Sequence, residues 1–181
     1  MKGLLIGMMG IIVLFLSSCM DLKTSEQLET IESMNQTIDS LETVFNENKL
    51  DSIAKISLGA YGIENRIKNN YVSDTINIEL GKKMDAFKVM RRNLKPLGKS
   101  LSIIPESIEE ERAKLKELQA DIENGNGKRE KYDEYISFEQ GKVDQLKTLV
   151  TEYIRVKDQS IQTYDDLFDE LNAFSMSLLK K

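Results

Sequence analysis

Residues 143–179, VDQLKTLVTEYIRVKDQSIQTYDDLFDELNAFSMSLL, decide the fold of this chain. The apolar residues of this stretch recur at alternating steps of three and four, a spacing that places their side chains on one face of an α-helix. Ten positions fall on this seam: Leu146, Val150, Tyr153, Lys157, Ser160, Tyr164, Leu167, Leu171, Phe174 and Leu178. Only Lys157 and Ser160 depart from the apolar pattern. Because earlier apolar residues extend the seam, we predict one helix over residues 128–179, which is roughly 75 Å long if unbroken.

The same spacing continues through two earlier segments, residues 22–70 and 74–123. Between the second and third segments, residues 124–127 read Asn-Gly-Asn-Gly, a strong turn signal in which Gly125 suits a left-handed helix cap. A weaker signal lies at residues 69–75, where Ser73 or Asp74 is expected to cap the next helix. The chain therefore divides into three helical segments of similar length.

Both of the first two segments contain a point where the helix is open to interruption. In the first segment, two apolar runs join into one helix if Lys49 occupies a seam position, and we favour this reading; Asn46 and Asn48 allow a turn instead. In the second segment, the seam keeps its phase through Pro96 and Pro105, which favours a kink. The alternative is that a fresh helix begins at Pro105.

Charge placement indicates how the segments pair. If residues 124–127 close a hairpin, residues equally far from the turn face one another, so Lys82 and Lys83 approach an acidic stretch at 165–170. Likewise, Arg112 and its basic neighbours face the acidic first segment. The sequence therefore predicts an all-α fold: an elongated, coiled-coil-like, up-down-up three-helix bundle whose middle helix is kinked or broken near Pro96–Pro105.

Composition excludes several kinds of site. The 181 residues include no His and one Cys, so there is no imidazole general base, no His metal ligand and no internal disulfide. The net charge of −5 gives the chain no overall attraction to nucleic acid. We therefore expect no enzyme activity, no catalytic or metal-ligating residues, no cofactor and no nucleic-acid partner.

The first nineteen residues carry an export signal. Met1-Lys2-Gly3 precedes an uncharged, mostly apolar run, and small residues follow that run before the single Cys. The run is shorter than the ~20 residues that a helix needs to span a bilayer. The sequence Leu16-Ser17-Ser18-Cys19 resembles the lipobox of bacterial lipoproteins. An ordinary secretory signal or an uncleaved anchor is the alternative.

The resemblance implies that Cys19 is the lipid attachment residue. Its thiol would carry diacylglycerol, the chain would be cut before it, and the new amine would receive a fatty acid such as palmitate. We then expect residues 1–18 to be a cleaved signal peptide, 19–23 a lipidated tether and 24–181 a single helical bundle domain. Met20, rather than Asp, after the Cys favours the outer membrane over the inner one, and the face of that membrane stays open.

The predicted function is that of a membrane-anchored envelope lipoprotein, acting as a structural or protein-interaction scaffold. It broadly resembles helical envelope lipoproteins described as cell-wall-binding. Expected partners are the membrane, through the acyl chains, and an envelope protein; self-association is left open. The alternative is a ligand-binding module that uses a basic helix face or an inter-helix pocket to bind an anionic lipid or glycan. Its candidate anion contacts are Lys88, Arg91 and Arg92, although a solvated face balanced by nearby acids also explains them.

Overall fold

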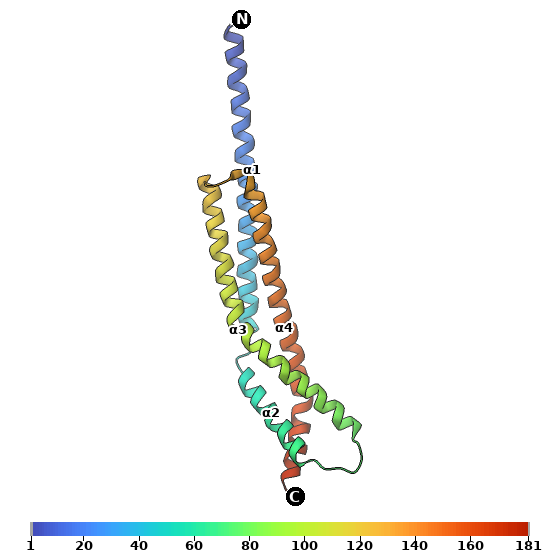
Figure 1. Cartoon of the computed structure of the whole chain (residues 1–181). Coiled ribbons are helices and arrows are strands. Elements are labelled where there is room, and N and C mark those ends of the chain that lie inside the picture. The colour runs from blue at the N-terminus through green and yellow to red at the C-terminus, as the bar shows by residue number, and fades with distance from the viewer. Residues whose placement is uncertain (1, 181) are drawn as a thin grey trace. The chain divides into compact units, whose positions relative to one another are not determined.

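The computed structural model describes the backbone of residues 2–180 and the side chains of residues 22–180. Cys19 and the predicted signal peptide lie outside the residues whose side chains are described. The described chain is helical, without strands, and the all-α prediction is confirmed. Its elements are α1 (Lys2–Glu47), α2 (Ile53–Asn70), α3 (Ile78–Asn124), the 3₁₀ turn η1 (Arg129–Lys131), α4 (Tyr132–Ser177) and the 3₁₀ turn η2 (Leu178–Lys180) (Figure 1).

The chain divides into two compact units. The first unit combines Met1–Thr43 with Ser107–Lys147, and the second combines Val44–Glu106 with Thr148–Lys181. Helices α1, α3 and α4 contribute to both units, whereas α2 belongs to the second alone. The prediction of a single bundle domain over residues 24–181 stays a prediction, because the helices cross the boundary between the units.

Each unit has its own apolar core, formed largely by the predicted seam residues. The buried apolar side chains of the first unit are Ile31, Met34, Ile38, Ile108, Leu115, Leu118, Ile122, Tyr132, Ile136, Val143 and Leu146. Those of the second unit are Phe45, Ile56, Ala60, Ile63, Ile67, Phe87, Met90, Leu94, Leu97, Ile104, Val150, Tyr153 and Leu171. Burial of this apolar surface is the main force that holds the helices of each unit together.

The first predicted segment, 22–70, is two helices rather than one, so the favoured continuity was wrong. Helix α1 ends at Glu47, and Asn48 closes its last turn by donating its backbone N–H to the Phe45 carbonyl at 3.0 Å. Beyond the break, the Leu50 N–H donates to the Tyr153 hydroxyl at 3.1 Å, and Lys157 Nζ donates to Asn48 Oδ1 at 2.8 Å. The break persists because polar groups of α4 satisfy the backbone and side-chain groups that it frees.

Helix α3 starts later than expected and is continuous across Pro96 and Pro105, so the middle helix is not broken there. Asn77, rather than Ser73 or Asp74, caps it: the Asn77 side-chain oxygen accepts the Leu80 N–H at 3.0 Å. The Ser73 hydroxyl is used instead within the preceding loop, where it accepts the Thr75 N–H at 3.3 Å. This local bond holds the loop in a turn and delays the helix.

The α3–α4 connection is the predicted turn. Gly125 has φ +65° and Gly127 has φ +74°, both left-handed. The Gly125 N–H donates to the Ile122 carbonyl at 3.2 Å, and the Asn126 N–H donates to the Asp121 carbonyl at 2.8 Å. This pair of bonds is the Schellman motif, which satisfies carbonyls at a helix C-terminus. The prediction of a left-handed cap at Gly125 is confirmed.

Two glycines are expected to respond oppositely to substitution by alanine. Gly125→Ala should lower the free energy of unfolding by about 1–2 kcal/mol, because an L-residue pays a steric cost in the left-handed region. A Cβ there would also clash with the Arg129 guanidinium, so that side chain must move. Gly141→Ala, inside α4 with nothing within 4 Å of the new Cβ, should raise it by about 1 kcal/mol. Urea unfolding of both variants measures these changes, and equal signs would contradict the assigned turn.

Ion pairs within each unit join oppositely charged stretches that the sequence analysis placed opposite one another. In the first unit, Arg112 Nη2 on α3 lies 2.8 Å from both Asp39 Oδ1 and Glu42 Oε2 on α1. In the second unit, Lys83 Nζ on α3 lies 2.7 Å from Glu170 Oε1 on α4. Such partly exposed pairs contribute little stability individually, so their value is in fixing the register of neighbouring helices.

Candidate functional site

The three candidate anion contacts do not form one site. Arg91 forms a bidentate ion pair with Glu64 on α2. Its Nε and Nη2 donate to the two carboxylate oxygens at 2.7 and 3.0 Å. The guanidinium also lies 5.5 Å from the Tyr61 ring centroid. Hydrogen bonding to Glu64 raises the pKa of Arg91, so the pair stays charged. A bidentate pair of this kind leaves Arg91 little capacity for an external anion.

Lys88 and Arg92 are exposed on α3, and no ion pair involves them among the described residues. Lys88 lies three positions before Arg91 and four before Arg92, so its side chain is a neighbour of both on the helix surface. With Arg91 engaged by Glu64, what remains is two exposed cations on a helix surface. This arrangement favours the interpretation that Lys88, Arg91 and Arg92 belong to a solvated helix face balanced by nearby acids.

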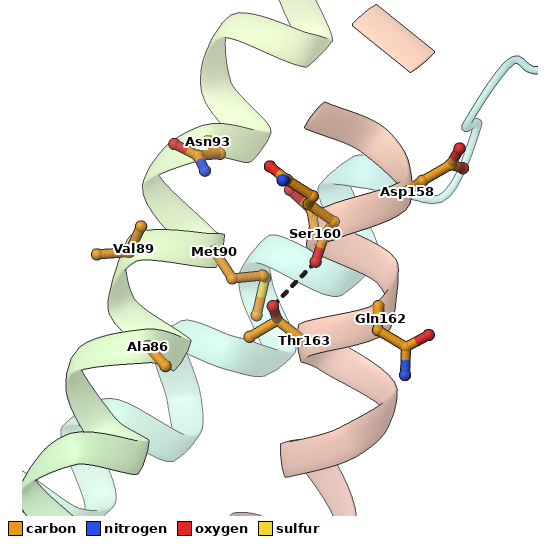
Figure 2. Close-up of a pocket in the computed structure, with 9 residues that line it drawn as sticks. Ala86, Val89, Met90, Asn93, Asp158, Ser160, Gln162 and Thr163 are labelled. Carbon is orange, nitrogen blue, oxygen red and sulfur yellow. Dashed lines mark hydrogen bonds between the residues drawn. The ribbon is translucent and has the colours of Figure 1, made fainter. Parts of the chain in front are cut away.

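An open groove of about 700 Å³ lies between α3 and α4 in the second unit (Figure 2). Ala86, Val89, Met90 and Asn93 of α3 face Asp158, Gln159, Ser160, Gln162 and Thr163 of α4. The groove exists because two seam neighbours are small: Ala86 and Ser160 leave space that larger residues would fill. It lies one to three helical turns before Pro96, and it is an inter-helix hollow of the kind that the ligand-binding alternative requires.

The two hydroxyl groups that line the groove already bond to carbonyls of their own helix. The Ser160 side chain is 2% exposed and donates to the Val156 carbonyl at 2.7 Å. The Thr163 hydroxyl donates to the Gln159 carbonyl at 2.9 Å, the bond drawn in Figure 2. Ligand sites combine an apolar cavity with convergent, available polar groups. The groove has the shape of a shallow binding surface without that chemistry.

Glu111 is the polar residue that interrupts the seam of α3, and it lies in the first unit. Its Oε2 is buried and has no hydrogen-bond partner among the described residues. Burial raises the pKa of Glu111, and the negative charge of Glu139 on α4 raises it further, against the opposing effect of Lys142. A carboxylate here therefore costs stability when it is ionised.

Glu111→Gln is expected to stabilise the protein at neutral pH by about 1 kcal/mol, because it removes a poorly solvated charge while keeping the shape. The folded-state pKa of Glu111 is raised. Protonation of Glu111 therefore stabilises the folded state. This stabilisation is complete below about pH 4, and it is lost as pH rises through the folded-state pKa. Urea unfolding at pH 7 and pH 4 measures this. The gain should vanish at the lower pH, whereas the control Glu29→Gln, at an exposed position of the same unit, should change the free energy of unfolding little at either pH.

Within residues 22–180, no group of three or more acidic, Cys or His side chains is placed to hold a metal ion. In that same part of the chain, no helix carries an apolar stretch long enough to cross a membrane. Cys19, the predicted lipid attachment residue, precedes this part.

Comparison with known proteins places the chain in no family. No protein-family model matches it, and no curated protein or solved structure matches it either.

Proposed function

We propose that this protein is a lipid-anchored helical protein of the bacterial envelope, attached through Cys19 and acting as a structural or protein-interaction scaffold. The observation that carries the proposal is the sequence Leu16-Ser17-Ser18-Cys19 after a short apolar run. Attachment through two or three acyl chains is what a stable anchor needs, since a single chain holds a protein only marginally. The outer membrane is the proposed location, and catalysis is not part of the proposal.

Support for the scaffold role comes from the helical fold and from one exposed segment. In the first unit, segments of α1, α3 and α4 pack around an apolar core, which supports the three-helix bundle that belongs to this proposal. In the α2–α3 connection, Val72 is 90% exposed and Ile76 is 91% exposed. Exposed apolar side chains in a loop are a feature of protein interaction sites.

Intact-mass measurement tests the anchor. The protein is expressed in a gram-negative host that processes lipoproteins, extracted from membranes with detergent and weighed. The expected mass is that of residues 19–181 plus a diacylglycerol group and one further acyl chain. The mass of the unmodified full chain, or of a cleaved chain without lipid, would contradict the proposal.

Photo-crosslinking tests the scaffold role. A photoreactive residue at Ile76 is expected to give a discrete crosslinked band in intact cells, because that side chain is exposed. The same probe at Lys82, exposed on α3, serves as the control. Identical labelling patterns at both positions would mean that the loop has no specific partner.

A further inference from the structure

We propose that the α3–α4 turn, residues 124–131, is the end of the first unit that docks on the phospholipid headgroups, with Lys128 and Arg129 contacting lipid phosphates. This inference rests on the proposed function, because it takes Cys19 as the point of membrane attachment.

The turn is tied to the start of the tethered helix. Lys23 Nζ on α1 lies 2.8 Å from Asp133 Oδ2 in the first turn of α4. The Gln27 side-chain amide donates to the other oxygen of the same carboxylate at 2.5 Å. Both contacts lower the pKa of Asp133, so the carboxylate is ionised at neutral pH and these bonds are available there. Figure 1 shows the α3–α4 turn beside α1 at this level.

Chain length then limits how far the turn can lie from the lipid. Lys23 lies four positions after Cys19 in the sequence. Even fully extended, four residues span at most about 14 Å. The distance is about 6 Å if they are helical. The α3–α4 turn therefore lies within reach of the headgroups whatever the conformation of the tether.

The turn presents cations that are not already used by the protein. In the described residues, neither Lys128 nor Arg129 forms an ion pair, and both are exposed. Within residues 22–180, the Arg129 side chain forms one hydrogen bond, from Nε to the Gly125 carbonyl at 3.3 Å, which leaves its terminal nitrogens free. By contrast, Lys131 is paired with Glu134.

The same end also carries acids, including the exposed Glu123 and Glu130. A general attraction to an anionic surface is therefore not expected. What the free Lys128 and Arg129 offer is short-range, charge-assisted hydrogen bonding to phosphate groups, which zwitterionic and anionic phospholipids share. A groove of about 270 Å³ lined by Lys23, Gly125 and Arg129 adjoins them and gives a headgroup room to approach.

A site-specific fluorophore tests the docking. If the Cys19 thiol is blocked by lipid, Asn126→Cys carries the only free thiol of the mature chain. The full lipidated variant is labelled and reconstituted into vesicles of phosphatidylethanolamine and phosphatidylglycerol that contain a headgroup-nitroxide lipid. The matched control is Gln145→Cys, also exposed. Quenching should be about fivefold stronger at 126, because position 145 lies roughly 20 Å further along α4. Equal quenching at the two positions overturns the proposal.

A second arm tests the two cations. In the Asn126→Cys background, replacing Lys128 and Arg129 together by Gln should reduce the quenching about twofold, because the phosphate contacts are lost while the tether remains. Unchanged quenching overturns the assignment of those side chains. Each preparation is weighed first. If Cys19 carries no lipid, the proposed function fails and this inference with it; if the lipid is present but position 126 is not quenched, only the docking fails.

Discussion

Cys19→Ala is expected to move the protein from the membrane fraction to the soluble fraction. Without the thiol, no thioether to diacylglycerol forms, and the acyl chains of the anchor are lost together. Each buried methylene contributes about 0.8 kcal/mol to membrane binding, so losing even five costs about 4 kcal/mol. That is about a thousandfold in partition, well beyond what any surface contact of the described residues would restore.

Cell fractionation followed by immunoblotting measures the change. The matched control is Ser18→Ala, which keeps a small residue before the cleavage site and should leave the protein on the membrane. If the Cys19→Ala protein is retained as strongly as the wild type, residues 1–18 act as an uncleaved anchor, and the lipidation proposal is wrong. Metabolic labelling with radioactive palmitate separates the two readings, because only a lipidated chain incorporates it.

The helical fold was predictable because helix periodicity is a local property. The seam residues of 143–179 lie on one face whatever the rest of the chain does, and Val150, Tyr153 and Leu171 are buried as expected. The hairpin followed from equally local signals, since Gly125 needs only its own left-handed φ to end α3. Charge complementarity then gave the pairing that Arg112 and Lys83 show.

The α1–α2 break was not predictable from residues 22–70 alone. What stabilises it is α4, through the bonds of Tyr153 and Lys157 to Leu50 and Asn48, more than 100 positions away. A signal was present in Lys157, a charged residue on a largely apolar seam. A polar seam residue needs a polar partner, and the residues at the break supply one in the Asn48 side-chain oxygen.

The candidate sites also differ in whether local sequence was enough to predict them. Cys19 could be proposed from four consecutive residues, because processing enzymes recognise a short stretch of chain. Whether Arg91 was available to bind an anion depended on Glu64, which α2 brings to it only after the break. The proposal that Lys128 and Arg129 contact lipid depended on finding the α3–α4 turn beside Lys23. The spacing of residues within one helical segment does not predict this contact between segments.

Phe87→Ala is expected to lower the free energy of unfolding by about 3–5 kcal/mol, the usual cost of removing a large aromatic side chain from a packed core. Phe87 is fully buried in the second unit, and its ring stacks on that of Tyr164 with centroids 6.2 Å apart and planes 15° apart. Small domains are stable by only about 5–15 kcal/mol, so this loss is a large fraction of the total. Urea unfolding followed by far-ultraviolet circular dichroism measures it.

The matched control is Phe138→Ala, because Phe138 is 62% exposed on α4 and contacts solvent on most of its surface. Its substitution removes a cation–π contact with Lys142, at 5.4 Å, and should cost less than about 1 kcal/mol. A Phe87→Ala loss no larger than that of Phe138→Ala would mean that Phe87 is not packed in the core, and the seam assignment of α3 would be wrong. The contrast is informative because the two changes delete the same atoms, so their difference reflects the surroundings of the two rings, of which burial is the largest part.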